Sequence, residues 1–562
     1  MNNQEIKTPR FLTVLLAFCM FTTGASGLVN EYVLATITTY ILGNSIEQFS
    51  IIIASMMLMM GLAGFVQSKI SDVRLIHKFM FIEIALALLG GFAPLAVYGA
   101  FGYFESHFQY ILYFFVLSIG FLIGFEIPIV MRIINQHKVS LKANLTIVYA
   151  MDYVGAFVGA LIWIKFLLKN YPLTEISFIV AGSNFLIAAI TIMYFLQTNV
   201  IGKRIIPITL VGLTFAILAF GYSQNRDLND LLEQKFYDDP IVYKETTKYQ
   251  HLVITKSNYN NDVRLYINGN TQTSSLDEKR YHDFLVHPLM SLVANAKNIL
   301  VLGGGDGLAL RELLKYKSIE SITLIELDPD MIKVASTNTY MRKMNNDSFK
   351  DARVHTQTPD GVKSVNVKGV YLSAENAMSG KPDEEWVGSV DVYTLDADQF
   401  ISRKNNKKWD AVIIDFPDPS SVELSKLYSK QFYRKLKSHL SRNALIAIQS
   451  TSPIHAKEVF LSIGYTLVES GYKTIPYRQN IPSFGDWGFY LAWNSEKTIS
   501  NMDNKIKDIK QFQVETDFIT PQLFRASLVF GKGELVSKNK CVNTIMFPCL
   551  LTQYTDYSWQ QD

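Results

Sequence analysis

The chain has 562 residues, of which 49% are hydrophobic, and its formal net charge is only +3. This length argues against a single domain, and the lack of a basic cluster argues against nucleic acid as a partner. The three cysteines, Cys19, Cys541 and Cys549, lack the spacing of metal ligands, so we expect no metal site. Cys541 and Cys549 either pair as a disulfide or remain free thiols.

The first 222 residues are a succession of long apolar runs. A helix needs about 20 residues to cross the hydrocarbon core of a bilayer. Seven runs are near or above that length, at 11–37, 49–66, 79–98, 110–131, 145–168, 176–196 and 205–221. The first run has no convincing site for cleavage of a signal peptide. We therefore predict a multi-pass α-helical membrane domain over 1–222, in contact with the lipid bilayer of the cell (inner) membrane.

Lysine and arginine are concentrated in alternate loops between these runs. Lys69, Arg74, Arg132 and Arg204 fall on one side, and the short loops of the other side carry little beyond Lys169. Positive charge usually stays in the cytoplasm, so we expect a cytoplasmic N-terminus. Seven spans then put the rest of the chain outside, unless the first or the short last run does not cross. The side of the membrane is left open at this stage.

Beyond residue 222 the sequence is typical of a soluble protein. We expect a polar linker at 223–243, then a small antiparallel β-sheet with a connecting helix at 244–295. An α/β Rossmann-like (methyltransferase-type) domain is expected at 296–500. It is interrupted at about 356–389 by a polar insertion longer than a normal connection. Residues 501–562 form a C-terminal extension.

A glycine-rich turn marks the start of the α/β domain. An apolar strand runs into Gly303-Gly304-Gly305, and a helix and a second strand follow, ending at Glu326. Glycines let the backbone approach a ligand closely, and an acid after the second strand binds the hydroxyls of a ribose. We therefore expect Gly303, Gly305 and Glu326 to hold a nucleoside.

Other acids also follow predicted strands. Asp306 follows the first strand, Asp415 ends the run 410–414, and Asp418 stands between two prolines; Asp396-Ala397 precedes them by a strand's length. Ligands of doubly wound sheets gather at the carboxyl ends of the strands. A pocket lined by these acids suits a cation with separated amines, each bound by charge-assisted hydrogen bonds.

An amine attacks as a nucleophile only after it has lost its proton. Asp415, at the end of a rigid strand, is the expected acceptor of that proton. A helix that opens near Asp277 would bring Tyr281 and His282 toward the glycine turn, where Tyr281 would orient the amine.

Together these residues resemble the spermidine/spermine synthase (polyamine aminopropyltransferase) family over about 249–493. The motifs, in order, are Tyr249-Gln250, Gly269 with Gln272, Asp277-Glu278 with Tyr281-His282, His287-Pro288, 303–307, 325–328, Asp396-Ala397, Asp415-x-x-Asp418-Pro419, Leu427-Tyr428, Gln449 and 482–489. The apolar half is similar to the membrane domain fused to some bacterial members.

The resemblance implies transfer of an aminopropyl group from decarboxylated S-adenosylmethionine, a co-substrate, with no permanently bound cofactor. The acceptor would be putrescine or another small polyamine, and the products spermidine and methylthioadenosine. By motif, Gln250, Glu326, Asp396 and Ala397 would bind the nucleoside, Gln272, His282, Asp306 and Asp418 the amine substrate, and Asp415 would accept the proton. A homodimer or homotetramer is also implied.

The sequence departs from the family pattern at three places. Ser420-Ser421 replaces the usual Gly-Pro after Pro419, and Leu308 stands where a further glycine is common. The insertion makes Asp360-Gly361 a competitor of Asp396-Ala397 for the adenine, although the distance onward to Asp415 favours Asp396.

Two alternative functions share parts of this pattern. A methyltransferase that uses intact S-adenosylmethionine has the same nucleoside loop but no need of the Asp415 and Asp418 pair. A polyamine transporter or sensor would use the synthase-like half only to bind ligand. Glu126 and Asp152, inside apolar runs, would then line a path for a cation, or else they pack between helices.

Overall fold

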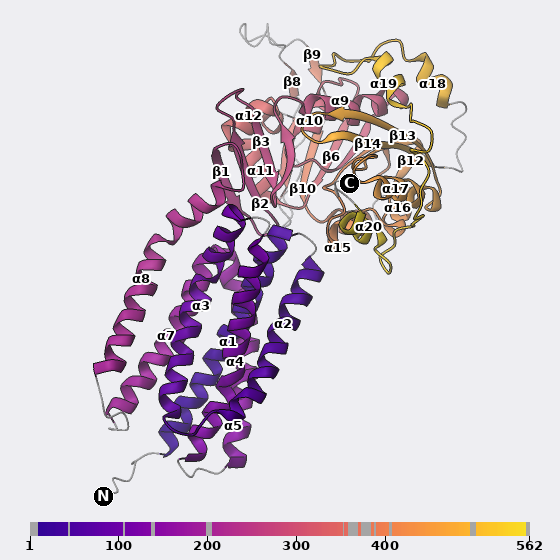
Figure 1. Ribbon diagram of the computed structural model, residues 1–562. Coiled ribbons are helices and arrows are strands. Elements are labelled where there is room, and N and C mark those ends of the chain that lie inside the picture. The colour runs from indigo at the N-terminus through magenta and orange to yellow at the C-terminus, as the bar shows by residue number, and fades with distance from the viewer. Residues whose placement is uncertain are drawn as a thin grey trace, which may run out of the picture. The chain divides into compact units, whose positions relative to one another are not determined.

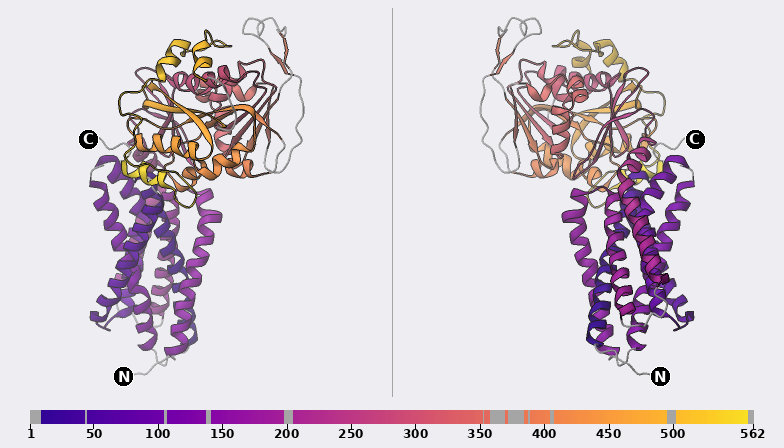
Figure 2. Two further views of the ribbon diagram at one scale, coloured as in Figure 1. Left: turned by 90° about the vertical axis from the view of Figure 1, so that its right-hand side faces the viewer. Right: turned by 90° about the vertical axis from the view of Figure 1, so that its left-hand side faces the viewer.

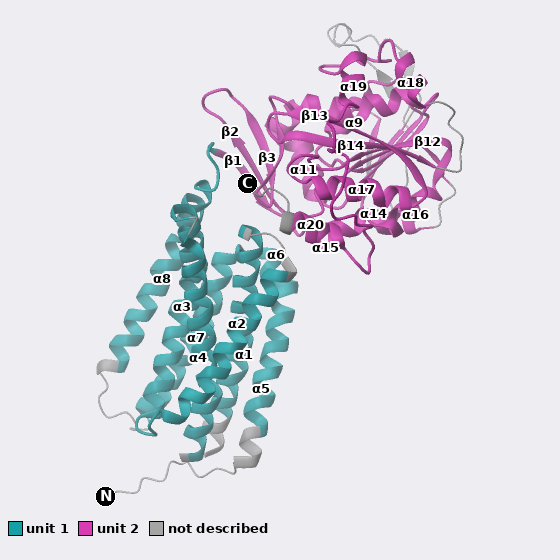
Figure 3. Cartoon of the chain, turned by 45° about the vertical axis from the view of Figure 1, so that its right-hand side comes forward, with its two compact units in different colours: residues 1–240 teal, residues 241–562 magenta. Residues whose placement is uncertain are grey.

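The computed structural model describes residues 9–42, 45–104, 107–136, 141–197, 205–351, 353–357, 369–371, 384–386, 389–403, 407–494 and 502–557. The chain divides into two compact units, residues 1–240 and 241–562 (Figure 3). Each unit has its own hydrophobic core.

Unit 1 is a bundle of long helices (Figure 1). They are α1 (Pro9–Leu42), α2 (Ser45–Val66), α3 (Leu75–Tyr103), α4 (Phe108–Gln136), α5 (Leu141–Ile162), α7 (Leu173–Gln197) and α8 (Ile205–Gln234), with the short segments η1 (Gln67–Lys69), η3 (Trp163–Leu167) and α6 (Leu168–Asn170). Within the described residues, seven helices are long and apolar enough to cross a membrane. Both runs whose crossing was in question are among them, because α1 continues through its glycines and the candidate span in α8 is Pro207–Gln234.

The structure differs from the expected linker at 223–243. Helix α8 continues without a break to Gln234, and the boundary between the units falls after Pro240. Residues 223–234 are polar, but Leu, Gln and Glu favour helix, so the helix extends beyond its apolar part.

Glycines bring helices of unit 1 into close contact. A Cβ atom on Gly155 of α5 would overlap the backbone of Phe21 in α1, and one on Gly124 of α4 would lie 2.7 Å from Met60 Cα in α2. Such small residues are typical of contacts between membrane helices. Glu126 is buried in this bundle, with 2% of its surface exposed.

Unit 2 begins with a four-stranded antiparallel sheet. Its strands are β1 (Ile241–Thr246), β2 (His251–Lys256), β3 (Val263–Ile267) and β4 (Asn270–Ser274). The sheet packs on α11 (Pro329–Thr337) and α12 (Thr339–Met344) through Leu252, Leu265 and Met341. Helix α9 (Glu278–Leu292) follows the sheet, as expected.

An eight-stranded sheet forms the centre of unit 2. Its strand order is β13-β14-β12-β11-β5-β6-β10-β7. The strands are β5 (Asn298–Gly303), β6 (Ser321–Glu326), β7 (Val354–Gln357), β10 (Ser389–Thr394), β11 (Trp409–Asp415), β12 (Leu440–Gln449), β13 (Tyr472–Ile481) and β14 (Gly485–Asn494). The pairs from β7 to β12 are parallel, whereas β14 is antiparallel to both β12 and β13.

Helices cover both faces of this sheet (Figure 2). In β5, Ile299 and Val301 pack into one core with α9 and α10 (Leu308–Leu314), and the alternating Leu300 and Leu302 pack into another. That second core includes residues of α14 (Ala397–Ser402), α16 (Lys430–Lys437) and α17 (Lys457–Glu469). The predicted Rossmann-like architecture is confirmed.

The predicted insertion joins two neighbouring strands, because β7 and β10 pair in parallel. Within it, the structure describes the antiparallel pair β8 (Gly369–Tyr371) and β9 (Glu384–Trp386). Asp360 and Gly361 lie outside the described residues. The remaining elements are η4 (Ser348–Lys350), α15 (Val422–Leu427), α18 (Met502–Asp508), α19 (Pro521–Ser527) and α20 (Cys549–Tyr557).

Candidate active site

The strand order changes direction at β5. Strand β6, next in sequence, pairs with one edge of β5, and the later strand β11 pairs with the other edge. Ligands of open α/β sheets bind in the crevice outside the carboxyl ends of the strands at such a switch point. Gly303 ends β5 opposite Asp415, which ends β11, so the glycine turn and the predicted proton acceptor are neighbours.

Close backbone approach explains two of the glycines. A Cβ atom on Gly303, whose φ is +84°, would collide with the main chain of Asp415. A Cβ on Gly305 would lie 2.5 Å from Glu326 Oε2. Residues with side chains would therefore push apart the two carboxylates that the glycine turn brings to the crevice.

Tyr281 and Asp415 are in direct contact. The Tyr281 hydroxyl donates to Asp415 Oδ1 at 2.6 Å, as expected for a helix leading into the crevice. Burial and the nearby Asp306 raise the pKa of Asp415 to about 6, although His282 and the Tyr281 hydroxyl oppose that rise. A carboxylate with this pKa is mostly ionised at neutral pH and still binds a proton well, as a general base must.

His282 is buried next to these acids. Its Nδ1 lies 3.1 Å from Glu278 Oε2 and 2.8 Å from the main-chain oxygen of the same residue. Burial lowers the pKa of His282, but Glu278, Asp306 and Asp415 more than compensate and raise it to about 9. Glu278 is in turn held by Arg311, whose two terminal nitrogens lie 2.7 and 2.9 Å from its carboxylate oxygens.

Glu326 ends β6 beside the glycine turn. The backbone N–H of Gly305 donates to its Oε2, and that of Asp328 to its Oε1, both at 3.0 Å. Burial raises the pKa of Glu326 to about 7. Gln250 reaches this end of the crevice, because its side chain hydrogen-bonds Asp328.

Asp396 lies at the same sheet edge, since Thr394 of β10 pairs with Glu326 of β6. Its Oδ1 accepts the backbone N–H of Gln399 and caps α14, and its Oδ2 lies 3.3 Å from Lys426 Nζ. Ala397, the first residue of α14, is buried. Asp396 and Ala397 therefore lie next to Glu326, the residue predicted to bind the ribose. The carboxylate of Asp396 also caps α14.

Gln272 is not brought to the acids by any hydrogen bond of the described residues. It lies half-buried on β4, and its amide donates to Asn270 O at 3.5 Å, a long hydrogen bond. Its predicted role in binding the amine has no support in these contacts.

Asp418 lies in the loop after β11 with three side-chain donors around it. Thr451 Oγ1 donates to Oδ2 at 2.9 Å, Gln449 Nε2 lies 3.4 Å from Oδ1, and the Tyr554 hydroxyl is the third. Burial nevertheless raises the pKa of Asp418 to about 6. Sequence reasoning missed Thr451 and Tyr554. Only Thr451 had a signal, because it lies two residues beyond the end of a central strand, β12.

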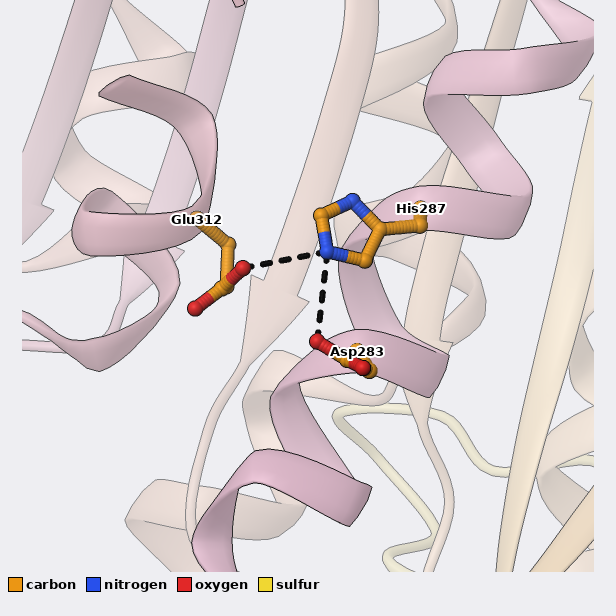
Figure 4. Close-up of side chains that lie close together, drawn as sticks. All are labelled: Asp283, His287 and Glu312. Carbon is orange, nitrogen blue, oxygen red and sulfur yellow. Dashed lines mark hydrogen bonds and ion pairs between the residues drawn. The ribbon is translucent and has the colours of Figure 1, made fainter. Parts of the chain in front are cut away.

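One cluster has the composition of a metal site. Asp283, His287 and Glu312 are buried, with His287 Nε2 3.2 Å from Asp283 Oδ1 and 3.0 Å from Glu312 Oε2 (Figure 4). Arg311 Nε and Lys315 Nζ also contact Glu312, each at 2.7 Å, and help hold the pKa of its carboxyl far below the ordinary value against the effect of burial. The side chains of Arg311 and Lys315 thus compensate the negative charge of the buried carboxylate. The cluster joins α9 to α10.

Comparison with known proteins shows which family the chain matches. Residues 278–371 and 387–505 match the spermine/spermidine synthase domain. A polyamine aminopropyltransferase of Aquifex aeolicus is 34% identical over 97% of this chain and 99% of its own length, and one of Leptospira interrogans is 34% identical over 91% and 92%. A crystal structure of spermidine synthase with the transition state analogue AdoDATO has 22% identity and a TM-score of 0.42, and covers 52% of this chain and 88% of its own.

A Rossmann-like sheet with buried carboxylates gathered at its switch point is typical of enzymes that bind a nucleoside-containing substrate. The similar proteins identify which group the transfer reaction moves. The chain belongs to the polyamine aminopropyltransferase family, and it is an enzyme that transfers aminopropyl groups.

Proposed function

We propose that the enzyme transfers the aminopropyl group of decarboxylated S-adenosylmethionine to putrescine, giving spermidine and methylthioadenosine. The observation that carries this proposal is the pair Asp415 and Asp418, three residues apart after β11 and beside the nucleoside end at Glu326. A methyl transfer needs no such pair, whereas a diamine presents one ammonium for each acid.

The reaction is a single displacement. The amine nitrogen attacks the propyl carbon bonded to the sulfonium, the new C–N bond forms as the C–S bond breaks, and neutral methylthioadenosine leaves. Asp415 takes the proton that the nitrogen loses, and Tyr281 fixes the direction of that carboxylate. Asp306 holds the propylamine of the donor, and Asp418 holds the distal ammonium of the acceptor. Alignment of the two reactants supplies much of the rate enhancement.

The test uses the purified full-length protein with putrescine and either decarboxylated or intact S-adenosylmethionine. We expect spermidine and methylthioadenosine, identified by mass spectrometry, from the decarboxylated donor only. Methyl transfer from the intact donor without aminopropyl transfer would refute the proposal. Uptake of labelled putrescine into liposomes that persists in Asp415→Asn would support a transporter instead.

We also propose that unit 1 spans the cell membrane seven times, with the N-terminus in the cytoplasm and unit 2 outside it. The positive loops on the N-terminal side support this orientation. So does the disulfide between Cys541 and Cys549, since such bonds persist mainly in oxidising compartments.

The orientation is tested by thiol labelling in intact cells. A Cys19→Ala variant leaves only Cys541 and Cys549, which are reduced and then treated with a membrane-impermeant maleimide. We expect labelling without lysis and only after reduction. Labelling that requires lysis would place unit 2 in the cytoplasm.

A further inference from the structure

A C-terminal segment, residues 541–557, packs beside the crevice. Asn543 is fully buried, and its Nδ2 donates to Ser425 O in α15 at 2.7 Å. Its backbone N–H donates to Thr466 Oγ1 in α17 at 2.9 Å, and its backbone oxygen accepts the N–H of Lys430 at the start of α16. This C-terminal segment, 541–557, lies beyond the last residue that matches the family domain, 505.

A disulfide closes the segment at its base. Cys541 pairs with Cys549, the first residue of α20, with the two Cα atoms 6.5 Å apart. Leu550 is fully buried in the core that includes Phe416, the residue after Asp415. Helix α20 contacts α15 and α17, and α15 directly follows the loop of Asp418. The disulfide and this packing together fix the position of α20.

Tyr554 of α20 reaches the acids of the crevice. Its ring packs against the same core, and its hydroxyl hydrogen-bonds the carboxyl of Asp418. We propose that the C-terminal segment forms part of the acceptor end of the active site, and that Tyr554 is a positioning residue that sets the affinity for the diamine by orienting Asp418. The proposal rests on the assignment of Asp418 to the distal ammonium.

Three donors leave Asp418 few free lone pairs, and these then point in a defined direction. Loss of the Tyr554 hydroxyl lets the carboxylate rotate about its remaining contacts to Thr451 and Gln449. A hydrogen bond to a charged group contributes roughly a tenfold to hundredfold effect on an equilibrium constant. Because the site is half-buried, water replaces part of the lost hydrogen bond. We therefore expect about a tenfold weaker affinity for putrescine.

The test measures putrescine binding by calorimetry on the full-length protein with methylthioadenosine present. Tyr554→Phe should raise the Kd and the KM for putrescine about tenfold and leave the KM for the donor unchanged. The control is Tyr465→Phe on α17, which packs against the same core and is not among the described partners of Asp418. It should bind putrescine like the wild type.

The disulfide between Cys541 and Cys549 allows a second test of the proposal. Reduction of the wild type should raise its Kd for putrescine, and the double variant Cys541→Ser/Cys549→Ser should have a raised Kd as well. The Kd of the double variant should not change when the reductant is added. A wild-type Kd in Tyr554→Phe, or a lower kcat at unchanged KM, would overturn the proposal. Because binding is measured apart from turnover, wild type that binds putrescine without transferring aminopropyl groups would refute the proposed function alone.

Discussion

Replacement of Asp415 by asparagine tests the proposed chemistry most directly. The amide has nearly the volume of the carboxylate and still accepts the hydrogen bond that Tyr281 donates at 2.6 Å. It cannot take a proton from the attacking amine. General bases contribute about 10²–10⁴ in rate, or about 3–5 kcal/mol of transition-state stabilisation. We therefore expect kcat/KM for putrescine to fall about 10³-fold at pH 7, with little change in the KM for the donor.

The pH dependence separates this explanation from simple loss of binding. Below about pH 6 the wild-type Asp415 is protonated, so its kcat/KM should fall about tenfold for each pH unit. In Asp415→Asn the amine must lose its proton to water, and free amines have a pKa near 10. The rate of the variant should therefore rise about tenfold per unit from pH 7 toward pH 10, and the gap to the wild type should narrow.

The assay follows methylthioadenosine by chromatography under initial-rate conditions. Asp410→Asn is the matched control, because Asp410 lies at the opposite end of β11 and accepts the backbone N–H groups of Lys297 and Asn298. It should keep kcat/KM within about threefold of the wild type, as expected of a site without contact to the reacting atoms. An Asp415→Asn enzyme with wild-type kcat/KM at pH 7 would show that Asp415 is not the proton acceptor.

Three further predictions follow from the charges of the site. Putrescine binding at pH 7.5 should release a fraction of a proton, because the dication screens Asp306 and Asp415, which add to the effect of Glu278 in raising the pKa of His282 to about 9; binding heats in buffers of different ionisation enthalpy report it, and His282→Gln should abolish it. Asp418→Asn should unfold at a higher temperature than the wild type at pH 8. The folded protein raises the pKa of this carboxyl from 3.8 to about 6, so its ionisation costs roughly 1–3 kcal/mol above pH 6, and the advantage should vanish at pH 4; an equal gain at both pH values would contradict this. Glu312→Gln should lower stability by about 3 kcal/mol in thermal unfolding, whereas Glu320→Gln, in an exposed pair with Lys297, should cost less than about 1 kcal/mol; equal losses would mean that the buried cluster is not stabilising.

The part of the site that follows strand ends was predictable from the sequence. Gly303, Asp306, Glu326 and Asp415 each follow an apolar run, and a parallel sheet brings such positions to one edge. Their spacing along the chain therefore gives their approximate place in space. The approach of Tyr281 to the glycine turn was predictable for a related reason, since one amphipathic helix leads there from the small sheet, but its contact with Asp415 was not predicted.

Contacts between distant segments were not predictable in this way. The pairing of Arg311 with Glu278 depends on how α10 packs against α9, and that of Tyr554 with Asp418 on a disulfide-closed segment at the end of the chain. No local pattern in the sequence predicts either contact. The polarity of residues 223–234 predicts a linker, but their helix propensity continues α8 to Gln234.

The two groups of acids in unit 2 differ in how their charge is compensated, and this difference points to the substrate. Around His287, the described residues Arg311 and Lys315 also contact Glu312, and the pKa of Glu312 falls. In the crevice the pKa values of Glu326, Asp415 and Asp418 all rise, because burial is not balanced by protein cations other than His282 among the described residues. Ionising these buried acids costs folding free energy, which is typical of functional sites. The positive charges of a sulfonium donor with a free propylamine and of a diamine acceptor would relieve this cost.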